Sequence, residues 1–180
     1  MTLTHILCRF ALAYGEGPKP NPFCGDALFA LSRYSTSFTG AGDGYWTDFF
    51  YQWAFAATAA TIPAGAVAER FNFNAYLGYS AFVSCWVYPV VVHWVWSRQG
   101  WLTYNLPGPT GRQAFLFDSG MIDFAGSAVV HMVGGLTGLV ACVMAGPRIG
   151  RFNSEGKPVE MPGHSAILVV LGTVLLWFGW

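Results

Sequence analysis

The sequence has few charged side chains. Only 10% of its 180 residues are Asp, Glu, Lys or Arg, whereas soluble domains carry about 25%. Nine basic residues balance nine acidic ones, and no basic tract is present. Nucleic acid is therefore not an expected partner. Because hydrocarbon excludes charged groups, this composition points to a membrane protein.

The sequence also lacks the common motifs of enzymes and metal centres. It has no P-loop, no dinucleotide-binding glycine pattern and no nucleophile elbow. Its four cysteines form no CxxC pair and no metal-type spacing. A haem-binding membrane subunit would need two facing histidines at similar depth, but only His131 lies deep in an apolar run. We therefore expect neither an enzyme nor a bound metal or cofactor.

Long uncharged runs are the dominant feature of the chain. They cover residues 49–68, 71–97, 124–147 and 161–180. About 20 apolar residues cross a hydrocarbon core of about 30 Å. Runs without strict alternation favour helices over a barrel. A soluble protein with four buried helices is the less favoured alternative, because few polar residues would be left to cover its surface.

The predicted fold class is therefore all-α: a polytopic transmembrane helix bundle with about four full spans. We predict one partial membrane domain over residues 1–180. Residues 1–14 are interpreted as the tail of a preceding span. The expected spans are approximately residues 48–69, 72–97, 121–146 and 163–180.

Basic residues near the span ends predict the orientation. Loops 69–72 and 146–163 hold four basic residues in a short length, and loops 15–47 and 98–117 hold four over a longer length. The higher density predicts that the two shorter loops are cytoplasmic.

Small residues recur at the spacing that lets helices approach closely in lipid. Two such series are present, Ala56, Ala60, Ala64 and Ala68, and Gly126, Gly134 and Gly138. Pro63 removes a backbone donor and is expected to bend its helix.

His131 is the most informative single residue, because it lies well inside an uncharged run. With Asp123, Ser127 and Gly135 it forms a series at four-residue spacing. On a regular helix, Asp123 and His131 would lie ~80° apart and ~12 Å along the axis. This row could line a conduit for a small polar solute. A core histidine bonded to a neighbouring backbone carbonyl is the alternative.

Aromatic residues gather near the predicted outer ends of the spans. Tyr51 and Phe55 share a helix face, and Trp94, Trp96 and Trp101 lie at the opposite end of the next run. An aromatic face attracts a cation. From the residues alone, an interfacial aromatic belt is the favoured interpretation.

Five segments together resemble the Amt/Mep ammonium transporters. The longest is DFAGSAVVHMVGGLTGLVACVMAGPR (123–148), and the others are YQWAFAATAATIPAGAVAERFNF (51–73), VYPVVVHWVWSRQGWL (87–102), GRFN (150–153) and GHSAILVVLGTVLLWFGW (163–180). The resemblance implies an eleven-span fold, of which this chain is a fragment, with no enzymatic activity. It further implies a multi-pass protein, expected in the plasma membrane, that assembles as a homotrimer.

The resemblance also implies roles for individual residues. Trp96 matches the tryptophan of the outer cation-recruitment site, Phe55 the outer gate and Tyr51 the neighbouring aromatic position. Asp123 matches the buried aspartate below that site, and His131 the first of two pore histidines. The second pore histidine belongs to a later span, so we expect that the fragment does not conduct alone. The implied function is ammonium or ammonia transport, and the alternative is a membrane ammonium sensor of the same fold.

Overall fold

The computed structural model describes residues 8–19, 21–31, 44–104 and 120–179. It divides into two compact units, Met1–Gly146 and Pro147–Trp180. Arg33 and Arg112 of the two predicted outer loops lie outside the described residues.

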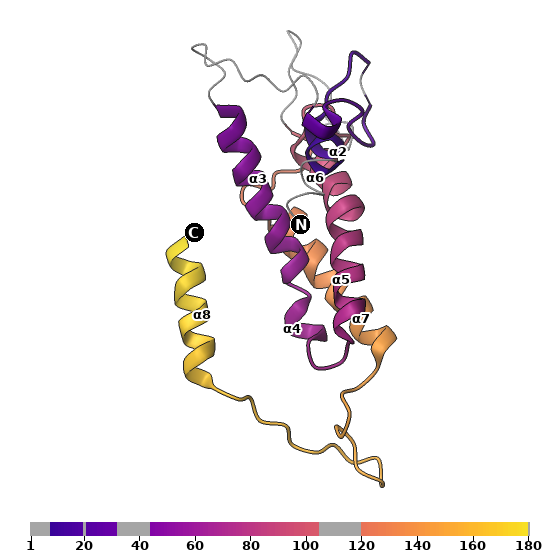
Figure 1. Ribbon diagram of the computed structural model, residues 1–180, viewed down its shortest axis with the longest axis vertical. Helices are drawn as coiled ribbons and strands as arrows, with labels where there is room; N and C mark the ends of the chain where they lie inside the picture. Colours follow the sequence, from indigo (N-terminus) through magenta and orange to yellow (C-terminus); the bar gives the residue numbers. More distant parts are fainter. Residues whose placement is uncertain (1–7, 20, 32–43, 105–119, 180) are drawn as a thin grey trace. The chain divides into compact units, whose positions relative to one another are not determined.

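The first unit is helical, and Figure 1 shows its long helices side by side. No strand occurs in the described part of the chain, which confirms the all-α prediction. The elements of this unit are α2 (Phe10–Tyr14), η2 (Phe29–Leu31), α3 (Gly44–Thr61), α4 (Ala64–Val67), α5 (Phe73–Phe82), η3 (Val83–Val87), α6 (Tyr88–Trp96), η4 (Ser127–Met132) and α7 (Val133–Ala145).

Two continuous helices are long and apolar enough to cross a membrane. The first, Phe73–Trp96, has 24 residues and a mean hydropathy of 1.4, and the second, Ser127–Ala145, has 19 residues and a mean hydropathy of 2.0. They lie within the predicted spans 72–97 and 121–146. The predicted span 48–69 overlaps α3, which begins earlier at Gly44, and contains α4. The predicted span 163–180 contains the shorter apolar helix α8 (Ala166–Gly179). The membrane limits of the four spans stay predictions.

Proline interrupts the segment of α3 and α4 but not the long helix that follows it. At Pro63, α3 has already ended at Thr61, and α4 resumes at Ala64, so the predicted bend is a full break. Pro89 lies just after the π-helical turn η3, where the Tyr88 N–H bonds the Val83 carbonyl five residues earlier. Because proline has no N–H to donate, a wider turn at this point lets the helix continue past it.

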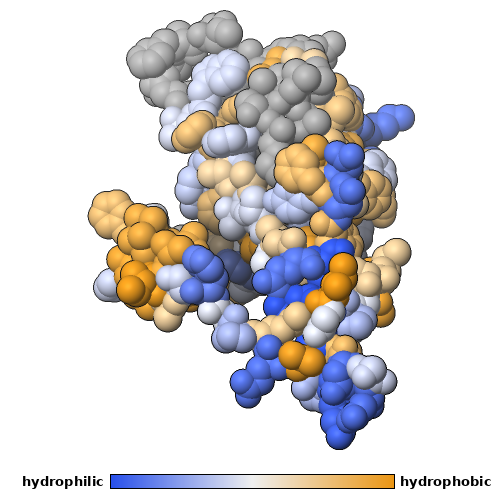
Figure 2. Space-filling model, turned by 60° about the horizontal axis from the view of Figure 1, so that its bottom comes forward, coloured by the Kyte–Doolittle hydropathy of each residue, from blue (hydrophilic) through white to orange (hydrophobic). Residues whose placement is uncertain are grey.

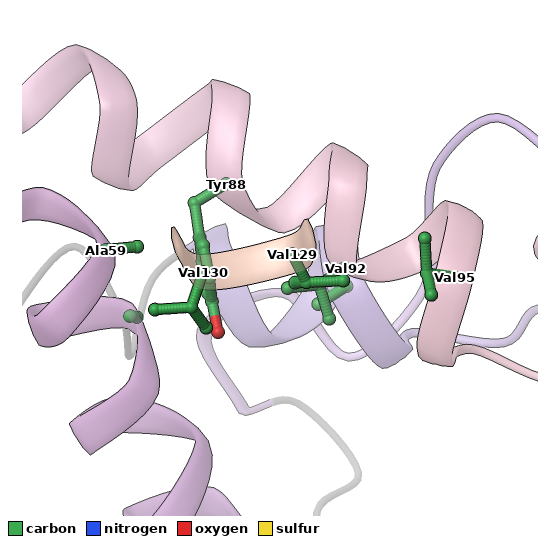
Figure 3. Packing of buried hydrophobic residues seen from close by; sticks show 8 residues of the cluster. Ala59, Tyr88, Val92, Val95, Val129 and Val130 are labelled. Atoms are coloured by element: carbon green, nitrogen blue, oxygen red, sulfur yellow. The ribbon is translucent and has the colours of Figure 1, made fainter. Parts of the chain in front are cut away.

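The core of the first unit forms where α3, α6 and η4 meet. Ala59 from α3 lies near Tyr88 and Val92 from α6 and near Val129 and Val130 from η4 (Figure 3). All five are buried. The small side chain of Ala59 lets the backbones approach closely, which is the main source of helix packing in lipid.

The predicted small-residue series are partly confirmed. Gly134 and Gly138 of α7 face the α3–α4 break: a Cβ added at Gly134 would lie 2.7 Å from Ile62 Cβ. Ala56 and Ala60 are fully buried. Ala68 is exposed instead, because the helix breaks at Pro63 and the series leaves the packed face.

Substitution of Gly134 by alanine tests this packing. We expect Gly134→Ala to be less stable than Gly135→Ala by about 1–3 kcal/mol, the usual cost of overpacking. The pair is matched, since both variants gain the same helix propensity and a Cβ at Gly135 meets nothing within 4 Å. Thermal unfolding of the detergent-purified chain measures the difference. Equal melting temperatures would mean that the Ile62 contact is not close.

The turn after α4 and the end of α7 meet at one end of the bundle. Arg70 Nη1 donates to the Gly146 carbonyl at 2.8 Å. This carbonyl follows the C-terminus of α7, where the helix has no internal donor. Loop 69–72 and the start of loop 146–163 thus share a side, and Trp96 lies at the far end of the helix that begins at Phe73. Which side faces the cytoplasm stays a prediction.

The second unit consists of a polar turn and α8. Asn153 Oδ1 accepts the backbone N–H groups of Glu155 and Lys157 at 3.0 and 2.9 Å, which closes the turn. The helix α8 is apolar along most of its length, and Thr173 Oγ1 donates to the Val169 carbonyl at 2.9 Å. Figure 2 shows α8 as a mainly hydrophobic surface.

Candidate functional site

Three aromatic side chains meet at the end of α6. The Tyr51 and Phe55 rings, one turn apart on α3, have centroids 4.8 Å apart. The Phe55 and Trp96 centroids are 5.7 Å apart with an interplanar angle of 89°. This edge-to-face geometry is a favourable one for aromatic pairs. The three residues that the resemblance assigns to an outer cation site thus form one group, called here the outer aromatic cluster.

Backbone groups of the segment before η4 hold the Trp96 indole in place. Its Nε1–H donates to the Asp123 carbonyl at 2.6 Å. Gly126 lies against the far edge of the same ring: a Cβ added there would be 3.6 Å from Trp96 Cη2 and 2.6 Å from Val130 Cγ2. Gly126 also has φ of 92°, a conformation that glycine adopts without strain. These contacts along the edge of the Trp96 indole therefore hold the ring in place.

The Asp123 carboxylate closes the N-terminus of η4. Oδ1 accepts the N–H groups of Gly126 and Ser127 at 2.7 and 2.9 Å. Oδ2 accepts those of Ala128 and Val129 at 3.0 and 2.8 Å. Helix N-termini leave four N–H groups without an internal acceptor, and this single side chain supplies acceptors for four consecutive donors.

The structure corrects the predicted row of Asp123, Ser127, His131 and Gly135. Asp123 is 5% exposed, whereas the other three residues are exposed. The regular-helix geometry fails because the helix starts only at Ser127, after the left-handed turn at Gly126. Asp123 lies before the helix and folds back onto its end, so it shares no face with His131.

His131 lies in the π-helical turn η4. The N–H groups of Val130 and His131 both bond the Gly126 carbonyl at 2.9 Å, so the turn is one residue wider than an α-helical turn. Such turns often occur at functional sites. The imidazole is exposed on the face that also holds Ser127 and Gly135. His131 is therefore not a core histidine in the described part of the chain.

The tryptophans near the end of α6 form two groups, where the sequence indicated one. Trp94 contacts Trp101 at 5.6 Å and Phe23 at 5.7 Å between ring centroids, and its Nε1–H donates to the Phe23 carbonyl at 2.9 Å. These rings hold the loop after α2 and do not join the outer aromatic cluster. Sequence spacing alone gave no signal for the contact with Phe23, 71 residues away along the chain.

Among the residues that the structure describes, no group of three or more His, Cys, Asp or Glu side chains could hold a metal ion. The site offers aromatic faces, backbone carbonyls and one exposed imidazole.

Comparison with known proteins identifies the relatives of this chain. The model of the Ammonium Transporter Family matches residues 1–180. The chain belongs to the ammonium transporter family. The resemblance found in the sequence is thereby confirmed.

Plant ammonium transporters are among the similar proteins. The chain is 50% identical to ammonium transporter 1 member 3 of Solanum lycopersicum and covers 36% of that protein. It is 52% identical to ammonium transporter 1 member 3 of Oryza sativa subsp. japonica and covers 34% of it. Both alignments include 99% of this chain. The chain thus spans about a third of the length of these relatives.

A solved structure named Sensor Amt Protein has the same fold. It superposes with a TM-score of 0.79 at 35% sequence identity, over 99% of this chain and 41% of that one. The helical arrangement described above is therefore part of the larger Amt fold. Ammonium transporter family members are integral membrane transporters and not enzymes, so this chain belongs to a membrane protein.

Proposed function

We propose that this chain forms the outer cation site and part of the pore wall of an ammonium transporter. The observation that carries the proposal is the outer aromatic cluster: the rings of Tyr51, Phe55 and Trp96 are in contact. A hydrogen bond from Trp96 to the Asp123 carbonyl holds the cluster in one geometry.

Ammonium is the substrate for which this arrangement is suited. A cation over an aromatic face gains about 0.5–2 kcal/mol, and tryptophan is the strongest of these faces. Ring faces and carbonyls replace part of the water shell without a fixed negative charge at the point of contact. The Asp123 carboxylate is directed to the η4 N-terminus, so Asp123 acts in this proposal by positioning Trp96 and η4.

In this proposal, ammonium separates into a proton and neutral ammonia below the outer aromatic cluster. Moving a monovalent ion into a low-dielectric pore costs many kcal/mol, and neutral ammonia avoids most of that cost. His131 then offers hydrogen bonds to the passing ammonia. Its exposed position on the η4–α7 face supports a role in the pore lining.

Membership of the family supports two further proposals. We propose that the complete protein is a multi-pass protein of the plasma membrane and that it assembles as a homotrimer with one pore per subunit. The 180-residue chain does not conduct alone, because its exposed η4–α7 face needs the remaining helices of the pore. Met132 and Leu136 beside His131 are 61% and 58% exposed, which supports this expectation.

An ammonium sensor of the same fold is the second candidate. The structural relative named Sensor Amt Protein supports it at 35% identity. The plant relatives named ammonium transporters support transport at 50% and 52% identity. The higher identity favours transport.

Substitution of Trp96 tests the outer cation site. In a full-length transporter that contains this chain, Trp96→Leu should raise the half-saturation concentration for ammonium roughly 2- to 30-fold, the equivalent of about 0.5–2 kcal/mol of cation–π attraction. Uptake of 15N-ammonium by cells that lack their own ammonium transporters measures it. Trp86→Leu is the matched control, because Trp86 lies on the same long helix and is 48% exposed. Unchanged half-saturation in Trp96→Leu would reduce Trp96 to an interfacial belt residue.

A further inference from the structure

Ser127 carries an exposed hydroxyl group at the start of a mainly apolar helix. It is the first residue of η4, which opens the 19-residue helix Ser127–Ala145 with a mean hydropathy of 2.0. His131 and Gly135 are exposed on the same face. Polar side chains inside a membrane span usually face a cavity or the interior of a bundle. Ser127 therefore belongs with His131 on the face that the proposed function assigns to the pore.

The hydroxyl hydrogen of Ser127 is committed to Asp123. The Ser127 Oγ donates to Asp123 Oδ1 at 3.3 Å, and this is the one hydrogen bond of the hydroxyl group in the described part of the chain. A hydroxyl group has two acceptor lone pairs besides its hydrogen. Because the hydrogen is taken and the residue is exposed, the oxygen is available to accept an N–H group.

Other hydroxyl groups in the helices are satisfied differently. Thr137 Oγ1 and Thr173 Oγ1 donate to carbonyl groups four residues earlier in their own helices, at 2.7 and 2.9 Å. Ser127 has no such carbonyl group, because its helix begins only after the left-handed Gly126. The carboxylate of Asp123 takes the place of that carbonyl group, and its charge strengthens the hydrogen bond. A polarised hydroxyl oxygen is in turn a better acceptor.

The π-helical turn η4 brings Ser127 and His131 toward one line. Four residues of an α-helix turn through ~400°, which leaves a drift of ~40°. A wider turn rotates less per residue, so the drift between these two positions is smaller. They are one turn apart, roughly 5–6 Å along the axis. Two hydrogen bonds of ~2.9 Å that meet at one tetrahedral nitrogen span about 5 Å between their partners. One ammonia molecule therefore fits between the two side chains.

We infer that Ser127 is a substrate-binding residue that forms, with His131, a two-point site for one ammonia molecule, an inference that rests on the proposed function. One N–H group of ammonia donates to Ser127 Oγ. A ring nitrogen of His131 accepts a second N–H group or donates its own N–H to the ammonia lone pair, so the site works with either tautomer of a neutral imidazole. Ammonia thereby gains two partners in place of water after it leaves the outer aromatic cluster.

The N-terminus of η4 does not depend on the Ser127 hydroxyl group. Its contact of 3.3 Å is the longest of the five hydrogen bonds that the described residues donate to the Asp123 carboxylate. The other four come from backbone N–H groups at 2.7–3.0 Å, and a substitution of Ser127 by alanine keeps all of them. Removal of the hydroxyl group should therefore leave folding unchanged, so that a loss of transport reports on the site.

Uptake kinetics of a full-length transporter that contains this chain test the role of Ser127. Ser127→Ala should lower the maximal rate of 15N-ammonium uptake per folded protein at least threefold. The half-saturation concentration should change less than twofold, because the outer aromatic cluster sets it. Ser127→Thr keeps the hydroxyl group and should retain most of the rate. Thr137→Ala is the matched control, since it removes a hydroxyl group of the same helix that is bonded to its own backbone.

A double variant tests whether both side chains hold the same molecule. His131→Ala should reduce the rate by a smaller factor in the Ser127→Ala background than in the wild type, because the two-point site is already lost. Reductions that multiply would contradict the shared site. A Ser127→Ala protein that melts earlier but transports at the wild-type rate would assign the hydroxyl group to the helix cap and overturn the inference. If the wild type itself transports no ammonium, the proposed function fails; if only Ser127→Ala is without effect, the inference alone fails.

Discussion

Replacement of Asp123 by alanine is expected to destabilise the protein by about 2–4 kcal/mol and to abolish high-affinity ammonium uptake. The variant leaves four N–H groups at the start of η4 without their carboxylate acceptor. Loss of a helix cap costs about 0.5–2 kcal/mol, and each hydrogen bond to a charged group contributes about 1.5–3 kcal/mol. The same loss frees the segment whose carbonyl holds the Trp96 indole.

Asparagine at position 123 separates hydrogen bonding from charge. Asp123→Asn keeps one acceptor oxygen but removes the charge. The structure predicts partial unfolding, since one oxygen can serve Gly126 and Ser127 but the amide NH2 would face the N–H groups of Ala128 and Val129. Thermal unfolding of the purified variants measures this. A fully stable Asp123→Asn protein would contradict the capping geometry.

A surface variant provides the control for Asp123→Ala. Glu155→Ala removes a carboxylate from an exposed pair with Lys157 at 2.8 Å and should cost less than about 1 kcal/mol.

Replacement of His131 by alanine should lower selective ammonium uptake at least tenfold and leave folding and assembly unchanged. The imidazole is exposed on the η4–α7 face, so its removal creates no cavity in the core. A desolvated ammonia molecule needs hydrogen-bond partners, and a buried polar group without a partner costs about 1–3 kcal/mol. Uptake of 15N-ammonium with potassium as the competing ion measures both rate and selectivity.

Met132→Ala is the matched control for His131→Ala. Met132 follows His131 in the same π-helical turn and is 61% exposed. If both variants transport equally, His131 has no special role in the pore. If His131→Ala reduces the yield of folded protein instead of transport, its role is in packing.

The sequence predicted the fold class well, because hydrocarbon length and charge exclusion act on each run separately. It also predicted that Tyr51 and Phe55 share a helix face, since four-residue spacing survives in any regular helix. The family resemblance was needed to add Trp96 to them. Its Phe55 contact joins α3 to α6 across the bundle, and spacing carries no information about such contacts.

Local backbone geometry explains the predictions that failed. The row from Asp123 to Gly135 assumed a continuous helix, but the left-handed conformation of Gly126 separates Asp123 from the helix. The alanine series from Ala56 to Ala68 assumed a bend at Pro63, and a full break occurs there. Both failures arise at residues whose conformation depends on their tertiary neighbours.

The contacts of the buried His93 ring could not be predicted from the sequence either. Its Nδ1 lies 2.8 Å from the Ala13 carbonyl oxygen and its Nε2 lies 2.7 Å from the Asn21 carbonyl oxygen, and every residue type carries such a carbonyl. No pattern of side chains could therefore have identified these partners.

The most direct test of the account is ammonium flux through the purified full-length protein in liposomes. With 15N-ammonium added outside the liposomes at buffered pH, the wild type should accumulate label inside well above the level in protein-free liposomes. Trp96→Leu should shift the concentration dependence of this flux to higher ammonium concentrations. Saturable ammonium binding without flux above the protein-free level would contradict transport and favour the sensor.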